Sequence, residues 1–408
     1  MIHVCFGLHD KTGRYSKFTG TAMLSLFDNT TSEVTVHILH DNTLTQDNRE
    51  KFIYLAGRYG QLVKFYNVEE LCADKLAKMI ELVPSVKTAR VSVGAFYRLL
   101  IPQILSEDID KCVYLDSDML VNLDIKELWQ IELGDKPLAA VREMEANAYN
   151  YKTHDAAQKY LLSSGIVEYD EYFNSGLLVM NLLYLRDAEE LIMNGVKWRG
   201  EHPQCNCFDQ DIWNYLFSKN YLRLSAKYDR FIYNERLQGR SQIQKAIYHC
   251  TNPTIGLKIN DSFNRLWMNY FMKTPFFDEE TFGRLYDSFE QIHSELKSSM
   301  RNLSAMMSGK TRAFFTAPQN VQATKEIFSV QRGEEIILAE NQESLKKLIA
   351  IMKKAQGKKL FFIILPAFPF GALIQEGFSF GKDFVNGLEF LSAEHGFPLN
   401  SYPLIQVM

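Results

Sequence analysis

Two aspartates interrupt an apolar segment of this chain. Asp116 and Asp118 lie within KCVYLDSDMLVNL, residues 111 to 123. Residues two apart in a strand project to the same side, so the two carboxylates would converge roughly 7 Å apart. Two anions held this close need a metal ion, a lysine or arginine partner, or solvent at the end of the strand. For the two aspartates alone, all three interpretations are open.

A histidine at the end of another predicted strand strengthens the metal interpretation. His249 lies in AIYHCT. Two carboxylates and one imidazole form a mixed N/O ligand set, which suits Mn²⁺ better than Mg²⁺ or Ca²⁺. A lone strand histidine is more often a structural residue, so its value comes from its joint appearance with Asp116 and Asp118. Together the three residues predict a site for Mn²⁺, with Mg²⁺ as the alternative.

Short apolar segments alternate with helical patterns over about the first 270 residues. The segments that predict strands are IHVCFGL, EVTVHILHD, QLVKFYNV, KCVYLDSD and PLAAVRE. The segments with apolar residues at a spacing of three to four, which predict helices, are KFTGTAMLSLFDN, TQDNREKFIYLAGRYG and VSVGAFYRLLIPQIL. This alternation predicts an α/β fold with a mostly parallel mixed sheet covered by helices.

In such sheets, ligands bind beyond the carboxyl ends of the strands. Leu8, His9 and Asp10 close the first predicted strand, as Asp116 and Asp118 close the fourth. The pattern therefore places Leu8, His9 and Asp10 beside the two aspartates.

The pattern changes after about residue 275. Residues 278 to 308 look helical and polar, and from about residue 311 strands and helices alternate again, as in QESLKKLIAIMKKAQ and KLFFIIL. We expect an α/β domain over 1–275, a helical connector over 276–310, and a small α/β domain over 311–408 for acceptor recognition or assembly. The small domain lacks the GxGxxG fingerprint of dinucleotide binding.

Composition limits the function classes. The 408 residues are 46% apolar and 23% charged, as in ordinary globular proteins, and the net charge of −4 argues against nucleic acid as a partner. Six cysteines without a CxxC pair, and the lack of a basic leader or of an apolar run of ~20 residues, predict a cytoplasmic protein. The basic segments ESLKKLIAIMKKAQGKK and KSSMRNLSAMMSGKTR suit peripheral contact with the inner face of a membrane, or the outer face of ordinary domain helices.

Several motifs, in order, resemble the retaining nucleotide-sugar glycosyltransferases of family 8, which include glycogenin and bacterial lipopolysaccharide galactosyltransferases. The motifs are FGLHD followed by a tyrosine, VGAFYRLLIPQIL, VYLDSDMLV, YFNSGLLVMN, FDQDIWN and YHCTNP. The resemblance covers roughly residues 1 to 275 and implies a GT-A fold. Beyond His249 the family usually has glycine and then Lys-Pro-Trp. Here the segment is HCTNPTIGLKIN, so Lys258 is a displaced candidate for the pyrophosphate-binding lysine.

The resemblance implies a UDP-sugar site around the metal. By this likeness Asp116, Asp118 and His249 bind the metal that bridges the diphosphate of the donor. Leu8 and Asp10 would lie against the uridine, and Tyr15 would stack on the uracil. The other donor contacts that it implies are His9, Arg98, Ser117, Asn174, Ser175, Asp209, Gln210 and Lys258.

Each of these assignments has a structural alternative. Tyr15 could be a residue at the start of a helix, and Arg98 could form a salt bridge to one of the aspartates. The Asn174 and Ser175 pair favours a turn on backbone grounds alone. Asp209 could cap the helix that follows it. Its neighbour Asp211 has the strongest case for a purely structural role.

The implied chemistry assigns catalytic roles to Arg98, Asp209 and Gln210. A divalent metal stabilises the charge that develops on the departing nucleotide. Gln210 matches the family residue on the far face of the sugar, but an amide is a poor nucleophile. We therefore favour a front-side route, in which the leaving phosphate accepts the proton of the acceptor.

The resemblance implies a metal-dependent retaining hexosyltransferase that moves galactose or glucose from a UDP-hexose to a glycan acceptor. Add-on domains occur in bacterial members that glycosylate surface proteins, so a surface glycoprotein is the favoured acceptor and a lipopolysaccharide or capsule the next. The altered segment after His249 leaves a catalytically degraded UDP-sugar-binding protein as an alternative. A nucleotidyltransferase is disfavoured because GLHDKTGRY lacks the dense glycine run of such enzymes.

Overall fold

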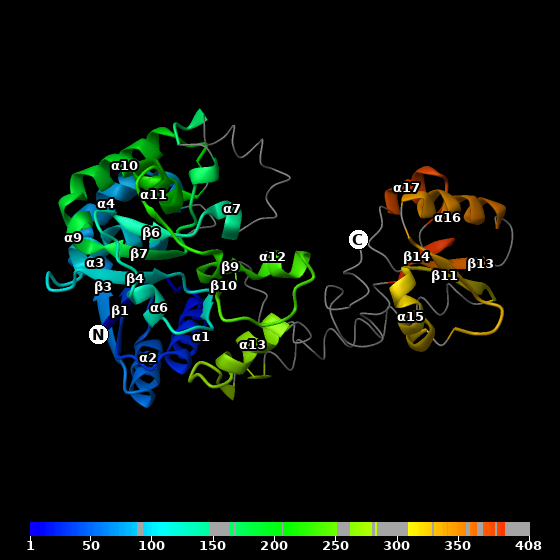
Figure 1. Cartoon of the computed structure of the whole chain (residues 1–408), viewed down its shortest axis with the longest axis horizontal. Coiled ribbons are helices and arrows are strands. Elements are labelled where there is room, and N and C mark those ends of the chain that lie inside the picture. Colours follow the sequence, from blue (N-terminus) through cyan, green and yellow to red (C-terminus); the bar gives the residue numbers. More distant parts are fainter. Residues whose placement is uncertain are drawn as a thin grey trace. The chain divides into compact units, whose positions relative to one another are not determined.

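The structure is a computed structural model, and the chain divides into two compact units (Figure 1). The first unit contains the described residues up to Asp278, and the second those from Glu279 onward. The described residues are 1–87, 93–146, 163–166, 169–205, 207–250, 262–279, 282–283, 309–328, 330–340, 342–355, 360–364, 370–379 and 382–387. The predicted connector lies largely outside them.

A seven-stranded sheet forms the centre of the first unit, in the order β3-β2-β1-β4-β7-β6-β8 (Figure 1). The strands β1, β2, β3 and β4 pair in parallel, β7 runs antiparallel to both of its neighbours, and β8 pairs in parallel with β6. The strands are β1 Ile2–Leu8, β2 Val34–His40, β3 Leu62–Asn67, β4 Lys111–Leu115, β6 Leu138–Ala140, β7 Leu177–Asn181 and β8 Leu222–Arg223. This confirms the predicted α/β fold with a mostly parallel mixed sheet.

Helices cover both faces of this sheet, with α4, α10 and α11 on one side and α1, α2 and α13 on the other (Figure 1). Every residue of β2 is buried, as expected of a parallel strand between two helical layers. The larger helices are α1 Arg14–Asn29, α2 Gln46–Arg58, α4 Ala73–Leu82, α10 Glu189–Glu201, α11 Phe208–Phe217 and α13 Ser262–Phe271. The shorter ones include α3 Val68–Leu71, α6 Lys126–Trp129, α7 Glu143–Ala146, α9 Leu182–Asp187 and α12 Ile232–Leu237.

A second, three-stranded sheet has the order β5-β10-β9. Its strands are β5 Met119–Val121, β10 Ile247–His249 and β9 Arg230–Phe231. Because β10 runs antiparallel to β5 with His249 opposite Met119, the histidine arrives beside Asp118 from far along the chain.

Two local predictions differ from the structure. The predicted helix over 91–105 is a 3₁₀ helix, Val93–Leu100, followed by the single-turn α5, Ile101–Ile104. Pro102 lacks an amide hydrogen, and so a continuous α-helix through this segment would lose one of its hydrogen bonds. Asp116 and Asp118 were predicted to lie on one strand, but β4 ends at Leu115 and both lie in the turn before β5.

The second unit is a small parallel α/β fold, as predicted for the C-terminal region. Its sheet has the order β12-β11-β13-β14 with parallel pairing throughout. The elements are β11 Thr311–Thr316, α15 Val321–Ile327, β12 Glu335–Leu338, α16 Gln342–Lys354, β13 Leu360–Ile364, α17 Phe370–Gln375 and β14 Phe384–Asn386. Among the described residues of the unit, ten that are buried, including Phe315, Leu348 and Phe362, form its own apolar core. The limits of the three predicted regions remain predictions.

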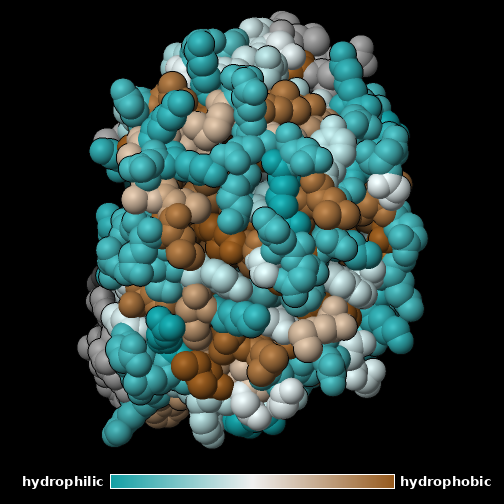
Figure 2. Space-filling model, turned by 90° about the vertical axis from the view of Figure 1, so that its left-hand side faces the viewer, coloured by the Kyte–Doolittle hydropathy of each residue, from teal (hydrophilic) through white to brown (hydrophobic). Residues whose placement is uncertain are grey.

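The surface of the first unit is mixed. Figure 2 shows the face on which α3 and α9 lie, where hydrophobic residues are interspersed among hydrophilic ones. Within the described ranges, the helices are too short or too polar to cross a membrane.

Candidate active site

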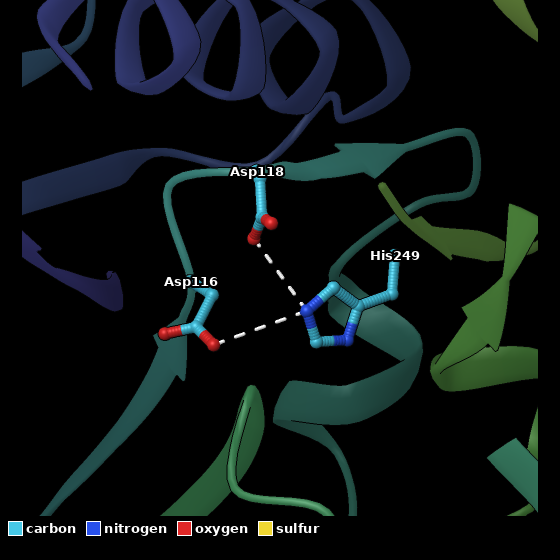
Figure 3. Close-up of side chains that lie close together, drawn as sticks. All are labelled: Asp116, Asp118 and His249. Carbon is cyan, nitrogen blue, oxygen red and sulfur yellow. Dashed lines mark ion pairs between the residues drawn. The ribbon is translucent and has the colours of Figure 1, made fainter. Parts of the chain in front are cut away.

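Asp116, Asp118 and His249 meet where the two sheets of the first unit join (Figure 3). The His249 Nε2 atom lies 3.5 Å from Asp118 Oδ1 and 3.9 Å from Asp116 Oδ2. One ligand atom from each residue lies within 4.8 Å of the other two. The predicted association of these three residues is therefore present, and we call them the metal cluster.

Backbone hydrogen bonds hold the turn that carries the two aspartates. The Asp116 amide donates to the Gly176 carbonyl at 2.8 Å, and the Met119 amide donates to the Asp116 carbonyl at 3.1 Å. The Cys250 amide donates to the Asp118 carbonyl at 2.9 Å, which ties the turn to the end of β10. The two carboxylates are thus positioned by main chain from three separate elements.

Asp229 orients the ring of His249. Its Oδ1 atom lies 3.0 Å from His249 Nδ1, and its side chain is fully buried. A hydrogen bond at one ring nitrogen directs the other, here Nε2, toward the two aspartates. Burial disfavours the imidazolium, but the charges of Asp229 and Asp118 raise the pKa of His249 well above its ordinary value. Conversely, the charge of His249 lowers the pKa of Asp118 against the opposing effect of burial.

The side chains around residue 176 leave no space for a larger residue than glycine. A Cβ atom at Gly176 would lie 2.5 Å from His249 Cε1, 2.9 Å from Asn174 Oδ1 and 3.0 Å from Asp116 Oδ2. The donor set of two carboxylates and one imidazole fits a divalent cation that accepts both nitrogen and oxygen, such as Mn²⁺.

Arg98 bridges the metal cluster to the start of α11. Its guanidinium donates to Asp116 Oδ1 at 2.7 Å and to the Ser175 carbonyl at 2.8 Å, and its Nε lies 3.2 Å from Asp209 Oδ2. Burial opposes the charge, but Asp116 and Asp209 raise the pKa of Arg98. The salt bridge considered as the alternative role for Arg98 is therefore present, at the centre of the site.

Four of the predicted donor contacts lie together beside Arg98, namely Asn174, Ser175, Asp209 and Gln210. The Ser175 hydroxyl donates to Asp209 Oδ2 at 2.9 Å, and the Ser175 amide donates to Gln210 Oε1 at 3.0 Å. Burial raises the pKa of Asp209 to about 6, although the nearby Arg98 acts in the opposite direction.

Asp209 does not cap α11, so the structural alternative for this residue is wrong. The helix begins after Cys207, whose amide donates to Asp211 Oδ2 at 2.8 Å. Asp211 also accepts from the Tyr172 hydroxyl at 2.6 Å and is fully buried, in keeping with the structural role expected of it. Asp209 is the second residue of the helix, and its side chain contacts Ser175 and Arg98 instead.

The end of β1 lies beside this site, because β1 pairs with β4. Asp10 accepts from the amides of Tyr15 at 2.9 Å and Ser16 at 2.8 Å, and it thereby holds the first turn of α1. Tyr15 is 50% exposed in that turn, so it is both a helix-start residue and an accessible aromatic ring. Leu8 is buried in β1.

Ser117 and His9 connect this edge to its neighbours. The Ser117 hydroxyl donates to the Gly7 carbonyl at 3.3 Å and accepts from Thr19 at 2.8 Å. His9 Nδ1 contacts the carboxylate of Asp41, which also accepts from the Tyr97 hydroxyl at 2.6 Å. Lys258 lies outside the described residues, so its predicted role stays a prediction, as do the donor contacts of the other residues.

Sequence reasoning missed three carboxylates of this site. Asp41 follows β2 directly, so the rule applied to the ends of the first and fourth strands would have found it. Asp229 and Glu143 are placed by long-range pairing, and nothing local in the sequence marks them. Glu143 Oε2 accepts from Asn174 at 2.9 Å and lies 3.4 Å from the amide nitrogen of Gln210.

Two solved structures share the fold of this chain. The galactosyltransferase LgtC, in complex with donor and acceptor sugar analogues, is 19% identical with a TM-score of 0.54, over 69% of this chain and 99% of LgtC. The bifunctional glycosyltransferase WbbM is 18% identical with a TM-score of 0.52, over 70% of this chain and 51% of WbbM. The predicted GT-A fold is confirmed.

Curated relatives match about half of this chain at low identity. General stress protein A of Bacillus subtilis is 24% identical over 54% of this chain and 71% of the relative. Lipopolysaccharide 1,2-glucosyltransferase of Escherichia coli is 25% identical over 50% of this chain and 56% of the relative. A Haemophilus influenzae protein that is named as a glycosyltransferase is 26% identical over 49% of this chain. This chain spans 55% of the length of that relative, or about half.

The model of glycosyl transferase family 8 matches residues 8–251, which include the last residue of β1, the turn with Asp116 and Asp118, the start of α11 and His249. The match therefore contains all three residues of the metal cluster. Since it also covers more than half of the sequence, the chain belongs to glycosyl transferase family 8.

Proposed function

We propose that this chain is a metal-dependent retaining hexosyltransferase that moves galactose or glucose from a UDP-sugar to a glycan acceptor. The observation that carries the proposal is the metal cluster, in which Asp116, Asp118 and His249 present ligand atoms within 4.8 Å of one another. Membership of family 8 supports the reaction class.

The three residues of the metal cluster would hold a divalent cation, Mn²⁺ for preference. When bound, such a cation supplies positive charge that stabilises the departing diphosphate. Arg98 adds a second fixed positive charge next to Asp116, at a distance of 2.7 Å. Asp229 keeps Nε2 of His249 directed at the site.

Gln210 supports the front-side route. Its carbonyl oxygen accepts from the Ser175 amide at 3.0 Å and from the Asn174 side chain at 3.1 Å. A carbonyl oxygen has two lone pairs, and both are engaged here. An oxygen held in this way is poorly placed to attack a sugar, so we propose that the leaving phosphate accepts the proton of the acceptor hydroxyl.

For the acceptor, we propose a glycan on a bacterial surface glycoprotein. The support is the layout of the chain, in which a GT-A unit is followed by a separate small α/β unit. The Escherichia coli relative is named for lipopolysaccharide, which makes a lipopolysaccharide glycan the second candidate. In both cases the second unit would serve acceptor recognition or assembly.

The decisive experiment is a donor screen. UDP-galactose and UDP-glucose are incubated with the full chain, with Mn²⁺ or with chelator, and the release of UDP is measured beside titration calorimetry with UDP and Mn²⁺. Asp118→Asn should abolish the Mn²⁺-dependent release because it removes one anionic ligand. Asp135→Asn, at an exposed loop position, is the matched control and should behave as wild type.

Two outcomes would contradict the proposal. Full activity of Asp118→Asn in the presence of chelator would exclude the metal assignment. Tight binding of UDP with Mn²⁺, without turnover of either donor, would favour a catalytically inactive UDP-sugar-binding protein.

A further inference from the structure

Glu143 is a buried carboxylate that the proposed reaction has not yet used. Its side chain is 8% exposed. Its backbone is fixed from both sides, since the Glu143 amide donates to the Tyr172 carbonyl at 2.8 Å and the Asn174 amide donates to the Val141 carbonyl at 2.9 Å. The carboxylate is therefore held against the segment that carries Asn174 and Ser175.

The amide of Asn174 is fixed at both ends. The Gly176 amide donates to Asn174 Oδ1 at 2.8 Å. A backbone N–H can only donate, so the atom that it meets must be the oxygen. The nitrogen, Nδ2, is the other atom of the amide, and it donates to Glu143 Oε2 at 2.9 Å.

The amide of Gln210 is fixed in the same manner. The Ser175 amide donates to Gln210 Oε1 at 3.0 Å, which identifies that atom as the oxygen. Gln210 Nε2 then lies 3.4 Å from the same Glu143 Oε2 atom. The backbone amides of Ser175 and Gly176 thus orient the two side-chain carbonyl oxygens. One oxygen of Glu143 accepts from both side-chain amide nitrogens.

These two amides lie next to the metal cluster. A Cβ atom at Gly176 would touch both Asn174 Oδ1 and Asp116 Oδ2. Arg98 also joins the two regions, since it donates to the Ser175 carbonyl and to Asp116. The two amides that Glu143 contacts therefore lie within the site itself.

We propose that Glu143 is a positioning residue for hexosyl transfer, which it serves by fixing the side-chain amides of Asn174 and Gln210. The inference rests on the proposed function. A carboxylate can only accept hydrogen bonds, so it is compatible with one orientation of each side-chain amide. A neutral amide at position 143 could also donate hydrogen bonds, and it would therefore be compatible with other orientations of Asn174 and Gln210. Fixed dipoles near developing charge act in the transition state, and misplacement by about 1 Å can lower a rate by about 100-fold.

The test compares Glu143→Gln with Glu143→Asp in the full chain, with UDP-galactose and UDP-glucose as donors and Mn²⁺ present. Glu143→Gln should lower kcat for UDP release by about 10- to 100-fold. KM for the donor and Kd for UDP with Mn²⁺ should remain within about twofold of wild type, because Glu143 is not itself one of the proposed metal ligands or donor contacts. Glu143→Asp keeps the charge and should recover part of kcat.

Glu145→Gln is the matched control, since Glu145 lies on the same helix, is exposed and pairs with Arg142. It should keep wild-type kcat. The inference is overturned if Glu143→Gln has wild-type kcat, if both Glu143 variants lose UDP binding together with kcat, or if Glu143→Asp is no better than Glu143→Gln. Wild-type protein that releases no UDP from either donor would instead refute the proposed function.

Discussion

At the scale of single residues, the geometry of the site depends on the absence of a side chain at residue 176. Gly176 has a negative φ and needs no glycine for its backbone conformation. What it supplies is space, because its missing side chain leaves His249 and Asp116 free to approach one another. The tight packing of protein interiors leaves little room for relaxation at such a point.

Gly176→Ala should therefore disable the metal cluster. The new methyl group would lie 2.5 Å from His249 Cε1 and 3.0 Å from Asp116 Oδ2, and the ring or the carboxylate must move. We expect Mn²⁺-dependent UDP binding to weaken by about 10-fold or more, at a cost in stability of about 1–3 kcal/mol. Calorimetry and thermal unfolding measure the two effects.

Gly57→Ala is the control for this substitution. Gly57 lies in α2, and an added Cβ there meets nothing within 4 Å. An alanine at a helical position should stabilise the chain by roughly 0.5–1 kcal/mol and leave UDP binding unchanged. Equal loss of binding in both variants would show that the effect of Gly176→Ala is not local.

At the scale of elements, polar side chains join the ends of the strands at the functional edge. A histidine pair lies within β1 and β2, and one of its members, His37, is buried. His3 Nδ1 lies 3.0 Å from His37 Nε2, and His37 Nδ1 lies 3.0 Å from the Tyr66 hydroxyl. His37 is fully buried. Burial, followed by the charges of His3 and Lys64, lowers the pKa of His37 to about 3.

The pH dependence of stability follows from this pKa. The unfolded chain has a histidine pKa of ~6.5, so below that pH the unfolded state binds a proton that folded His37 does not bind. The stability contributed by neutral His37 is complete above about pH 6.5 and is lost as the pH falls toward 3. Between pH 7 and pH 5 this one group should cost about 2 kcal/mol.

Urea unfolding at both pH values measures the loss. His37→Gln removes the titrating group, so its free energy of unfolding should fall less between pH 7 and pH 5 than that of wild type, whatever its absolute stability. If the two proteins lose equal stability over this interval, His37 is not the group responsible.

At the scale of the whole molecule, the chain contains two units with separate cores. The first unit buries a large cluster between its main sheet and the helices α4, α10 and α11, and the second unit has a smaller cluster of its own. Separate cores favour separate cooperative unfolding. Ligands of the site should then stabilise only the first unit.

Leu348→Ala tests this independence. Leu348 is fully buried in α16, so the substitution should destabilise the second unit by about 2–5 kcal/mol. UDP binding in the presence of Mn²⁺ should be unchanged. UDP with Mn²⁺ should raise the temperature of the unfolding transition of the first unit only. Leu338→Ala, at a side chain that is 41% exposed, should have a smaller effect on stability. A single transition, or weaker UDP binding by Leu348→Ala, would contradict two independent units.

The sequence by itself determined the local part of this protein. Alternation of apolar and polar residues has a fixed period in strands and helices, so β1, β2, β3, α1 and α2 were predicted nearly to their ends. The order of motifs predicted the family, and the rule for strand ends placed the end of β1 beside Asp116 and Asp118. These predictions depend only on residues that are close in the chain or on a shared pattern.

Tertiary structure alone decided how the site is held. Asp229 and Glu143 reach their partners through strand pairing and antiparallel bridges between distant segments, and no local pattern encodes such contacts. Long-range contacts also set the turn that brings Asp116 and Asp118 together. Gly176 pairs with the end of β4, and β10 pairs with β5, the strand that follows the turn. Sequence patterns report which residue types can do the chemistry, whereas the free energy that orients those residues comes from long-range contacts that exist only in the folded chain.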